Sequence, residues 1–403
     1  MQTEKMYELA FQYRTKRLWT KLYDTELFAV RLTDGEIGYC TVMGMLGEHI
    51  ALGLYVGARE FECLRQLLCG EVIIRGGEPE ITQECLQCSF EKKDFLDADE
   101  LAAARAYARA SGRRICGKNA YPKFVKYRAG RLPWHFDSEL DGQRICDALS
   151  AALAIAKRLE TSSKDALGLH PLEHGAGTMP LLWQKNGVWN WDKVAAPEPL
   201  PQSYPAPVLQ NDLTIRRLRR LEKRGTWEYG TMEIRVPVYA DPDSVAVEAP
   251  CFPMVLAGLD RTDDTMPPLE TVTDYAENAG QLLETFASAI CESGRRLPRQ
   301  ICVADARTHA FFQDFCDKTG VQLCLQTPLP DLEETLCDLR EHMESNLLEE
   351  EDFDELEHFL ALLMQMEDAD LSQLPPSVEK MLRELMNTGA LPPELEARLR
   401  RLL

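Results

Sequence analysis

The chain has 403 residues, of which 45% are hydrophobic and 27% charged, and its formal net charge is -20. This length and composition predict a folded chain with more than one core and exclude an intrinsically disordered one. Charged residues interrupt the first thirty positions, and no run of about 18 apolar residues occurs anywhere. The sequence therefore predicts a soluble, cytoplasmic protein without a membrane span.

The negative charge is unevenly distributed. Residues 331–370 contain sixteen acids and one base, a charge of -15, and residues 371–403 carry +1, which leaves -6 for residues 1–330. The body of the protein is therefore only mildly acidic. Its net charge does not exclude a polyanionic partner such as nucleic acid.

Residues 1–195 predict an N-terminal mixed α+β domain. The expected elements are a helix at 4–22, strands at 27–32, 36–44 and 49–57, and amphipathic helices at 97–110 and 142–159. Asp34 and Gly35 supply a hairpin turn that needs positive φ.

Thirteen cysteines are scattered through the chain, and only Cys85 and Cys88 have the spacing of metal ligands. A structural zinc site needs four ligands, so this pair is a weak candidate and two ordinary thiols are the alternative.

A basic stretch at residues 112–136 stands out within this domain. It holds seven Lys or Arg, five aromatic residues and no acid. Bases interleaved with aromatics favour single-stranded nucleic acid, because they combine phosphate contacts with stacking faces. The alternative is intramolecular, with the aromatics in the core and the bases covering it or meeting the chain's own acids.

A second basic cluster lies on a helix in the following domain. The candidate nucleic-acid-binding residues of the two clusters are Arg113, Arg114, Lys118, Tyr121, Lys123, Lys126, Tyr127, Arg128, Arg131, Trp134, Arg216, Arg217, Arg219 and Arg220.

Five prolines between residues 196 and 208 predict an irregular linker. Residues 209–345 then predict a mixed-sheet α/β domain. After the basic helix, its expected elements are strands at 232–239, 253–260 and 269–272, a helix at 274–293, a strand at 300–305, a helix at 307–319, a strand at 321–326 and a helix at 331–343.

This order of elements resembles a ribonuclease-H-like domain, and ICVADARTHAFFQDFCDKTGVQLCLQTPLPDLEETL, residues 301–336, resembles an integrase or transposase core. The resemblance implies Asp305 as the second acid of an active site and Glu334 or Glu341 as the third. Such enzymes clamp two Mg²⁺ or Mn²⁺ ions about 4 Å apart with carboxylates.

The first acid of such a site is less well matched. Glu233 is the candidate on the first strand, but Arg235 lies on the same face two residues on, and Asp260 closes the second strand. These departures favour an inactive scaffold without a cofactor over a metal-dependent nuclease or phosphodiesterase.

Residues 346–403 predict an acidic helical module. A helix-period apolar stripe runs through residues 353–363, and two short helices introduced by paired prolines follow. A docking module and a solvated tail both fit this pattern.

Nearly all of residues 1–345 also resembles an uncharacterised family of conserved cytosolic proteins from Gram-positive anaerobes. The clearest matches are DGEIGYCTVMGMLGEHIALGLYVG and GKNAYPKFVKYRAGRLPW. This resemblance implies a two-domain bacterial protein without an assigned activity. The sequence as a whole favours a binding or adaptor protein with nucleic acid or another protein as its partner, and the alternative is a metal-dependent nuclease.

Overall fold

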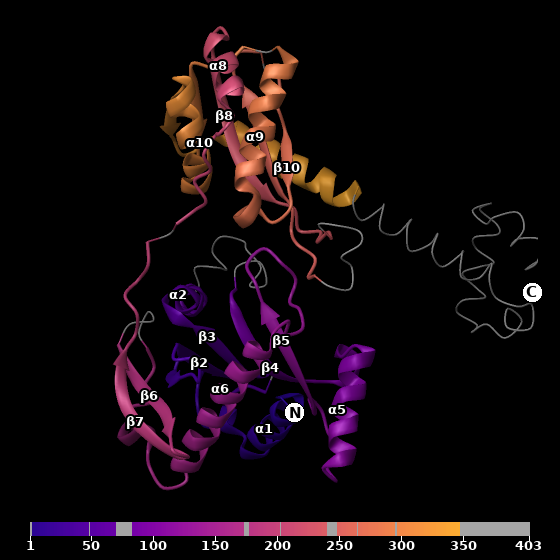
Figure 1. Ribbon diagram of the computed structural model, residues 1–403, viewed down its shortest axis with the longest axis vertical. Coiled ribbons are helices and arrows are strands. Elements are labelled where there is room, and N and C mark those ends of the chain that lie inside the picture. Colours follow the sequence, from indigo (N-terminus) through magenta and orange to yellow (C-terminus); the bar gives the residue numbers. More distant parts are fainter. Residues whose placement is uncertain are drawn as a thin grey trace, which may run out of the picture.

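The computed structural model describes residues 2–47, 49–69, 83–172, 177–201, 203–239, 248–263, 265–294 and 296–346. Two mixed sheets organise this part of the chain, one of seven strands and one of five. We refer to residues 2–195 as the N-terminal lobe and to residues 209–346 as the C-terminal lobe, which lie at the bottom and top of Figure 1. The expected acidic module at 346–403 lies outside the described residues, apart from residue 346.

The seven-stranded sheet has the order β5-β4-β3-β2-β1-β6-β7. Neighbouring strands are antiparallel except β1 and β6, which are parallel. The strands are β1 Phe28–Arg31, β2 Ile37–Met43, β3 Ile50–Val56, β4 Cys85–Glu91, β5 Tyr121–Tyr127, β6 Thr178–Lys185 and β7 Val188–Ala195. The three strands predicted at 27–32, 36–44 and 49–57 are confirmed, and Gly35 has the expected positive φ of 95°.

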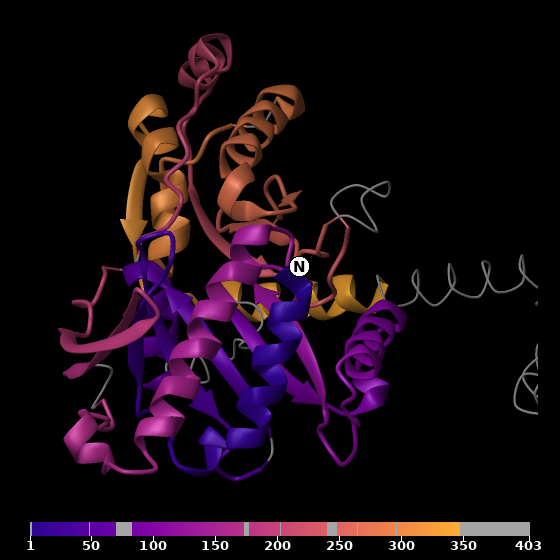
Figure 2. The same ribbon diagram turned by 60° about the horizontal axis from the view of Figure 1, so that its bottom comes forward.

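Helices cover the two faces of this sheet unequally. Helices α1 (Gln2–Lys16) and α6 (Glu139–Arg158) pack side by side on one face, as Figure 2 shows. Helix α2 (Gly57–Leu68) covers part of the other face through Phe61 and Leu64, and α5 (Ala98–Ala110) lies beside α1 and β5. The remaining short helices are η1 Leu18–Thr20, η2 Lys93–Phe95 and α7 Lys164–Leu167.

Two predicted helices need small changes of extent. The helix expected at 4–22 ends at Lys16, because Arg17 adopts a left-handed conformation with φ 51°, and η1 follows. The helices expected at 97–110 and 142–159 are α5, which begins after the Asp97 cap, and α6, which begins after Ser138.

The five-stranded sheet has the order β10-β9-β8-β11-β12. Strand β8 pairs antiparallel with β9 and parallel with β11, while β9–β10 is antiparallel and β11–β12 parallel. The strands are β8 Thr226–Glu233, β9 Met254–Asp260, β10 Glu270–Val272, β11 Gln300–Val303 and β12 Gln322–Leu325.

Helices α8 (Asp212–Arg220), α9 (Tyr275–Ser293) and α10 (Ala306–Thr319) share one core with one face of this sheet. Residues 330–346 form a further helix, whose apolar side chains pack on the opposite face. No helix among the described residues is long and apolar enough to cross a membrane.

The first strand of this sheet was predicted at 232–239, which is wrong by six residues. Strand β8 begins at Thr226 and ends at Glu233, so Glu233 lies at the strand end and not near its centre. Trp227 and Tyr229 alternate into the helical core, whereas Pro237 lacks the N–H that a central strand needs. The opposite face accommodates Leu336 because Gly230 carries no side chain there.

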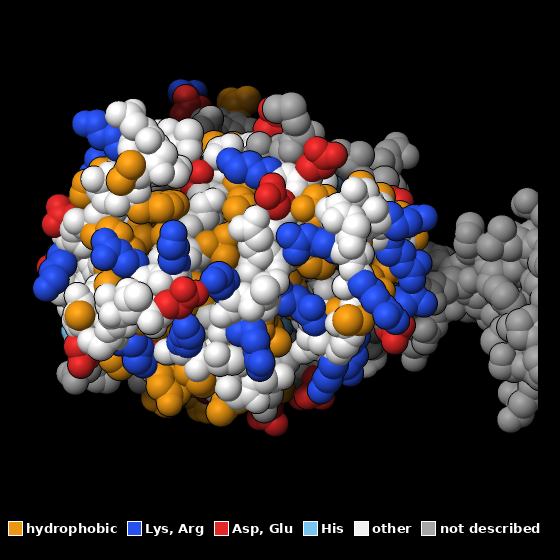
Figure 3. All heavy atoms as spheres, turned by 90° about the horizontal axis from the view of Figure 1, so that it is seen from below, with side chains coloured by type: hydrophobic (Ala, Val, Ile, Leu, Met, Phe, Trp, Pro, Cys, Tyr) orange, Lys and Arg blue, Asp and Glu red, His pale blue; other side chains and the backbone are white. Residues whose placement is uncertain are grey.

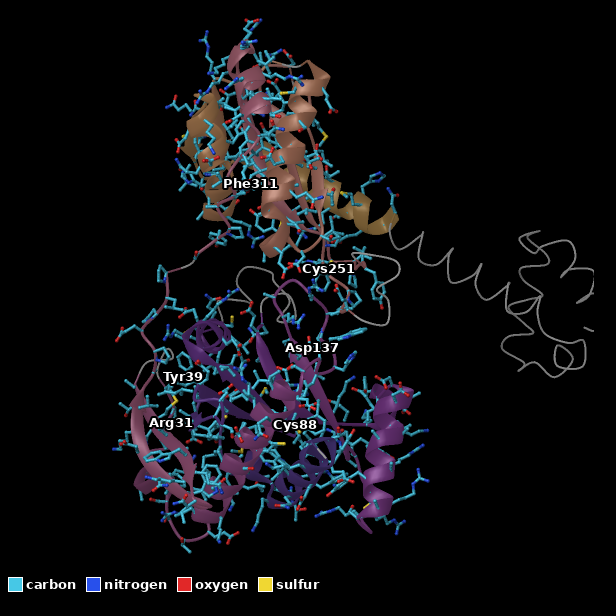
Figure 4. All side chains as sticks on the ribbon, viewed as in Figure 1. Arg31, Tyr39, Cys88, Asp137, Cys251 and Phe311 are labelled. Carbon is cyan, nitrogen blue, oxygen red and sulfur yellow. The ribbon has the colours of Figure 1, made fainter. Side chains whose placement is uncertain are left out.

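The two lobes are joined by backbone pairing as well as by residues 196–208. The loop that follows β5 contacts the segment that precedes β9, where Leu132 N donates to Pro250 O at 2.9 Å and Phe252 N donates to Gly130 O at 2.9 Å. Figure 4 labels Asp137 and Cys251 on the two sides of this junction. Arg131 adds an ion pair with Asp274 of the C-terminal lobe.

We predict that Gly258→Ala destabilises the C-terminal lobe by about 1–3 kcal/mol. A methyl group at Gly258 in β9 would lie against the Glu228 carbonyl oxygen and 2.9 Å from two ring atoms of Tyr229. Urea unfolding followed by tryptophan fluorescence measures the effect. The control is Gly280→Ala in α9, where no heavy atom lies within 4 Å. It should be neutral or stabilising by up to about 1 kcal/mol. Equal midpoints for the two variants would contradict the packing described for β9.

Candidate functional site

Asp305, the expected second acid, acts as the N-cap of α10. Its Oδ1 accepts a hydrogen bond from Thr308 N, and its Oδ2 accepts one from Thr308 Oγ1, both at 2.8 Å. Both carboxylate oxygens are therefore already engaged within the first turn of the helix. An N-cap of this kind stabilises a helix by satisfying an otherwise unpaired N–H.

The first strand places no acid level with Asp305. The parallel register pairs Val303 with Tyr229, so that the position level with Asp305 is Thr231. The Thr231 hydroxyl lies 3.1 Å from the Thr308 hydroxyl. A hydroxyl–hydroxyl contact thus stands where a two-metal site would need a second carboxylate.

Glu233 lies two residues further along the same face of β8, and a cation neutralises it. Its Oε1 accepts a hydrogen bond from Arg307 Nη1 at 2.8 Å. The Arg307 guanidinium also covers the ring of Tyr204, 5.8 Å from its centroid. From the sequence, Arg235 was expected to be the cation beside Glu233. In the structure, Arg307 in the first turn of α10 pairs with Glu233.

Asp260 lies at the opposite end of the sheet from Asp305, because it pairs with Trp227 at the start of β8. Burial would raise its pKa, but hydrogen bonds from Thr262 and the charge of Arg296 hold the pKa below its usual value. The Arg296 Nη2 atom is 3.2 Å from Asp260 Oδ2. The Asp260 carboxylate accepts a hydrogen bond from Thr262 N in the turn after β9, and it lies far from Asp305.

Glu334 and Glu341 are exposed on the helix at residues 330–346. Among the described residues, no group of three or more His, Cys, Asp or Glu side chains is arranged to hold a metal ion. The five expected acids, Glu233, Asp260, Asp305, Glu334 and Glu341, therefore do not converge on one point.

Cys85 and Cys88 do not form a ligand pair either. They lie three residues apart on β4, so the pleat directs them to opposite faces of the sheet. Cys85 packs with the α2 side, and Cys88 packs with the α1 and α6 side, where Figure 4 labels it. Burial raises the pKa of both thiols. A thiol that is buried in apolar surroundings is a poor metal ligand or nucleophile.

Four of the seven bases in the basic stretch are neutralised by the chain's own acids. The ion pairs are Lys123 with Glu100, Lys126 with Asp137 and Asp141, Arg128 with Asp137, and Arg131 with Asp274 and Glu248. The Lys126 Nζ atom lies 2.8 Å from Asp137 Oδ1 and 3.0 Å from Asp141 Oδ2. These four side chains hold the β5 edge and the junction between the lobes together.

Two aromatic residues of the same stretch, Tyr121 and Tyr127, pack against residues of the core. Tyr121 packs beside Tyr7 and Phe11, and Tyr127 packs with the cluster beneath α2. The indole N–H of Trp134 is buried and has no hydrogen-bond partner in the part of the chain that the structure describes. At Tyr121 and Tyr127 the contacts match the intramolecular alternative, in which the aromatics belong to the core.

The remaining bases of the stretch continue a basic surface that begins on α5. Between residues 101 and 118 there are five bases and no acid. We call these five exposed residues the basic end: Arg105, Arg109, Arg113, Arg114 and Lys118. None of them has a carboxylate partner among the described residues. Figure 3 shows Lys and Arg side chains gathered on the face of the N-terminal lobe that is turned away from the C-terminal lobe.

The packing of α1 explains why this surface forms. Tyr107 of α5 stacks on Tyr7 and Phe11 of α1, each with ring centroids 5.8 Å apart. Arg14 donates to the carbonyl oxygens of Asn119 and Cys116 at 3.2 and 3.3 Å. The carboxyl-terminal ends of the two helices therefore lie near each other, where basic side chains also interact favourably with the helix dipoles.

The second basic cluster is partly structural. The Arg219 Nε atom donates to Lys318 O at 2.5 Å, and Lys223 Nζ donates to Thr319 O at 2.6 Å, so both cap carbonyls at the end of α10. Arg216, Arg217 and Arg220 are exposed on α8.

A pocket of about 380 Å³ lies on the part of the N-terminal sheet that α2 leaves uncovered. Its lining includes His49, Gln87, Ser89, Glu91 and Trp134. Sequence reasoning missed all of these except Trp134. The signal was the alternation in CLQCSFE, where Gln87, Ser89 and Glu91 occupy every second position of a strand and thus one face.

Comparison with known families identifies two matched regions. Residues 4–170 match a domain of unknown function (DUF7309), and residues 214–340 match another domain of unknown function (DUF6930). Two such domains fit an uncharacterised family. No curated protein matches the chain.

We predict that a thiol reagent labels Cys116 and Cys337 in the native protein and spares Cys85 and Cys88. The first two are exposed and the last two are buried. Iodoacetamide labelling followed by peptide mass spectrometry measures the four sites, with a sample in urea as the fully labelled control. Added Zn²⁺ should not change the pattern. Selective protection of Cys85 and Cys88 by Zn²⁺ in partly unfolded protein, retained on refolding, would restore them as metal ligands.

Proposed function

We propose that this is a non-enzymatic, cytoplasmic nucleic-acid-binding protein built on a degenerate ribonuclease-H-like domain. The observation that carries the binding function is a contrast within the basic stretch. Lys123, Lys126, Arg128 and Arg131 are neutralised by acids, whereas the basic end has no carboxylate partner among the described residues. Unpaired cations on one surface are what phosphate contacts require.

The ribonuclease-H-like proposal is supported by the topology of the C-terminal sheet. In chain order its five strands are arranged 3-2-1-4-5, with the first three antiparallel and the last two parallel to the first. Helices lie on both faces of the sheet. The matched regions flank residues 196–208, which supports a domain boundary in this segment.

The non-enzymatic proposal is supported by the carboxylate positions. Thr231 stands level with Asp305, Arg307 neutralises Glu233, and Asp260 lies at the far end of the sheet. A cation beside Glu233 would repel a divalent ion, and two-metal catalysis needs carboxylates that converge. The C-terminal lobe would then act as a scaffold and not as a nuclease or phosphodiesterase.

We predict that the protein shows no Mn²⁺-dependent nuclease activity above that of Asp305→Ala. In that variant, loss of the α10 cap should lower the free energy of unfolding by about 0.5–2 kcal/mol without changing the background cleavage rate. Cleavage of labelled single- and double-stranded DNA in buffer that contains Mn²⁺ measures the activity. Cleavage by the wild type that Asp305→Ala abolishes would establish the enzyme instead.

We predict that the basic end binds single-stranded DNA with an affinity that falls by about tenfold or more between roughly 50 and 200 mM salt. The triple variant Arg109→Glu, Arg114→Glu, Lys118→Glu should bind about tenfold or more weakly at the lower salt. It leaves Arg113 in place, because the Arg113 guanidinium packs 5.9 Å from the Phe11 ring centroid. Fluorescence anisotropy with a labelled oligonucleotide measures both effects.

The matched control for this experiment is Arg216→Glu, Arg217→Glu, Arg220→Glu on α8, which changes the net charge by the same amount. It should bind about as tightly as the wild type. If the α8 variant alone loses binding, the interface lies on the C-terminal lobe. If the wild type does not bind at the lower salt, the nucleic-acid proposal fails.

A further inference from the structure

The pocket on the N-terminal sheet has a floor of two strands and separate walls. Strand β4 contributes Gln87, Ser89 and Glu91, and β5 contributes Lys123, Val125 and Tyr127. Residues 133–135 form one wall, and the start of α5 forms another. Its volume of about 380 Å³ lies in the range of roughly 300–1,000 Å³ that is typical of small-molecule sites.

Ser89 is the buried polar group of this floor. Its residue is only 2% exposed, and it lines the pocket. The hydroxyl can accept from a donor on a ligand as well as donate.

Glu91 is the carboxylate that remains available to a ligand. Its side chain is 23% exposed, and its nearest cationic partner is His49, whose Nδ1 lies 3.7 Å from Oε1. The side-chain nitrogen Nε2 of Gln87 lies within hydrogen-bond distance, 3.1 Å, of His49 Nε2. Among the described residues, no Lys or Arg forms an ion pair with Glu91.

The charged side chains of Asp97, Glu100 and Lys123 in the pocket lining already have partners within the protein. Asp97 and Glu100 form the capping box of α5, in which Glu100 N donates to Asp97 Oδ1 at 2.8 Å. Lys123 Nζ is 3.0 Å from Phe95 O and 3.5 Å from Glu100 Oε2. The pocket therefore holds three carboxylates against one lysine, and that lysine pairs with Glu100.

The indole of Trp134 forms an aromatic wall. Its ring lies 5.0 Å from that of His135, and the strand-like contact of residue 134 with Lys126 fixes its backbone. An aromatic face beside a carboxylate attracts a cation by its quadrupole as well as by packing against alkyl carbons.

From these contacts we propose that the pocket binds a small organic cation, an ammonium or guanidinium group on a short alkyl chain. The charged group donates hydrogen bonds to Glu91 and to the Ser89 hydroxyl, and the alkyl chain packs against Trp134. A positive ligand is favoured over an anion because the acids of the lining outnumber its lysine. The site is separate from the basic end, so the proposal does not depend on nucleic-acid binding.

The test uses the full chain and agmatine, a guanidinium on a four-carbon amine, measured by isothermal titration calorimetry. We expect saturable binding to the wild type, and a loss of affinity of about tenfold or more in Glu91→Gln, because a charge-assisted hydrogen bond is lost. Ser89→Ala should weaken binding several-fold. The uncharged 1,4-butanediol should not bind.

The matched control variant is Glu84→Gln. Glu84 directly precedes β4, whereas Glu91 is its last residue. The two side chains are similarly exposed, 26% for Glu84 and 23% for Glu91. Glu84 pairs with Arg59, outside the pocket. Its affinity for agmatine should equal that of the wild type. Thermal unfolding checks that each variant folds. No saturable binding to the wild type, or equal losses in Glu84→Gln and Glu91→Gln, would overturn the proposal.

Discussion

The alternation of side chains across the pleat of the two sheets is the constraint on which the pocket and the carboxylate positions of the C-terminal lobe depend. In β4 it sends Leu86, Cys88 and Phe90 into the core beneath α1 and α6, and it leaves Gln87 and Ser89 on the pocket side. In β8 it places Thr231 on the same face as Glu233 and sets the two beside the first turn of α10. A shift of register by one residue would exchange these faces, which would remove the polar floor of the pocket and the contacts of Thr231 and Glu233 with α10.

Charge neutralisation decides which part of the basic stretch remains free for a partner. The bases on β5 and in the loop after it meet acids that arrive from α5, α6 and the C-terminal lobe. Those on the end of α5 and just after it meet none among the described residues. Individual exposed ion pairs contribute only about 0–1 kcal/mol to folding stability. Their main consequence is electrostatic: the positive potential is reduced near the junction of the lobes and persists at the basic end.

The loop after β5 connects three features of the molecule. Arg131 binds Asp274 across the lobes, residues 130 and 132 pair with the backbone of residues 250 and 252, and Trp134 lines the pocket. A ligand that packs against Trp134 would thus contact the same short loop that joins the lobes.

The sequence by itself determined the class of the fold and most of the helices and strands, because periodicity and turn chemistry act over a few residues. It placed β1, β2 and β3 correctly and found the order of strands and helices in the C-terminal lobe. It missed the start of β8, because the alternating apolar residues of MEIRVPVY favoured a strand that begins six residues later. The partners of Lys126, Arg131 and Glu233 were decided only by the tertiary structure. Arg131 and Asp274 are 143 residues apart in sequence, and local patterns carry no information about contacts at that separation. For the same reason the sequence identified a basic stretch, whereas only the folded chain distinguished its neutralised bases from its free ones.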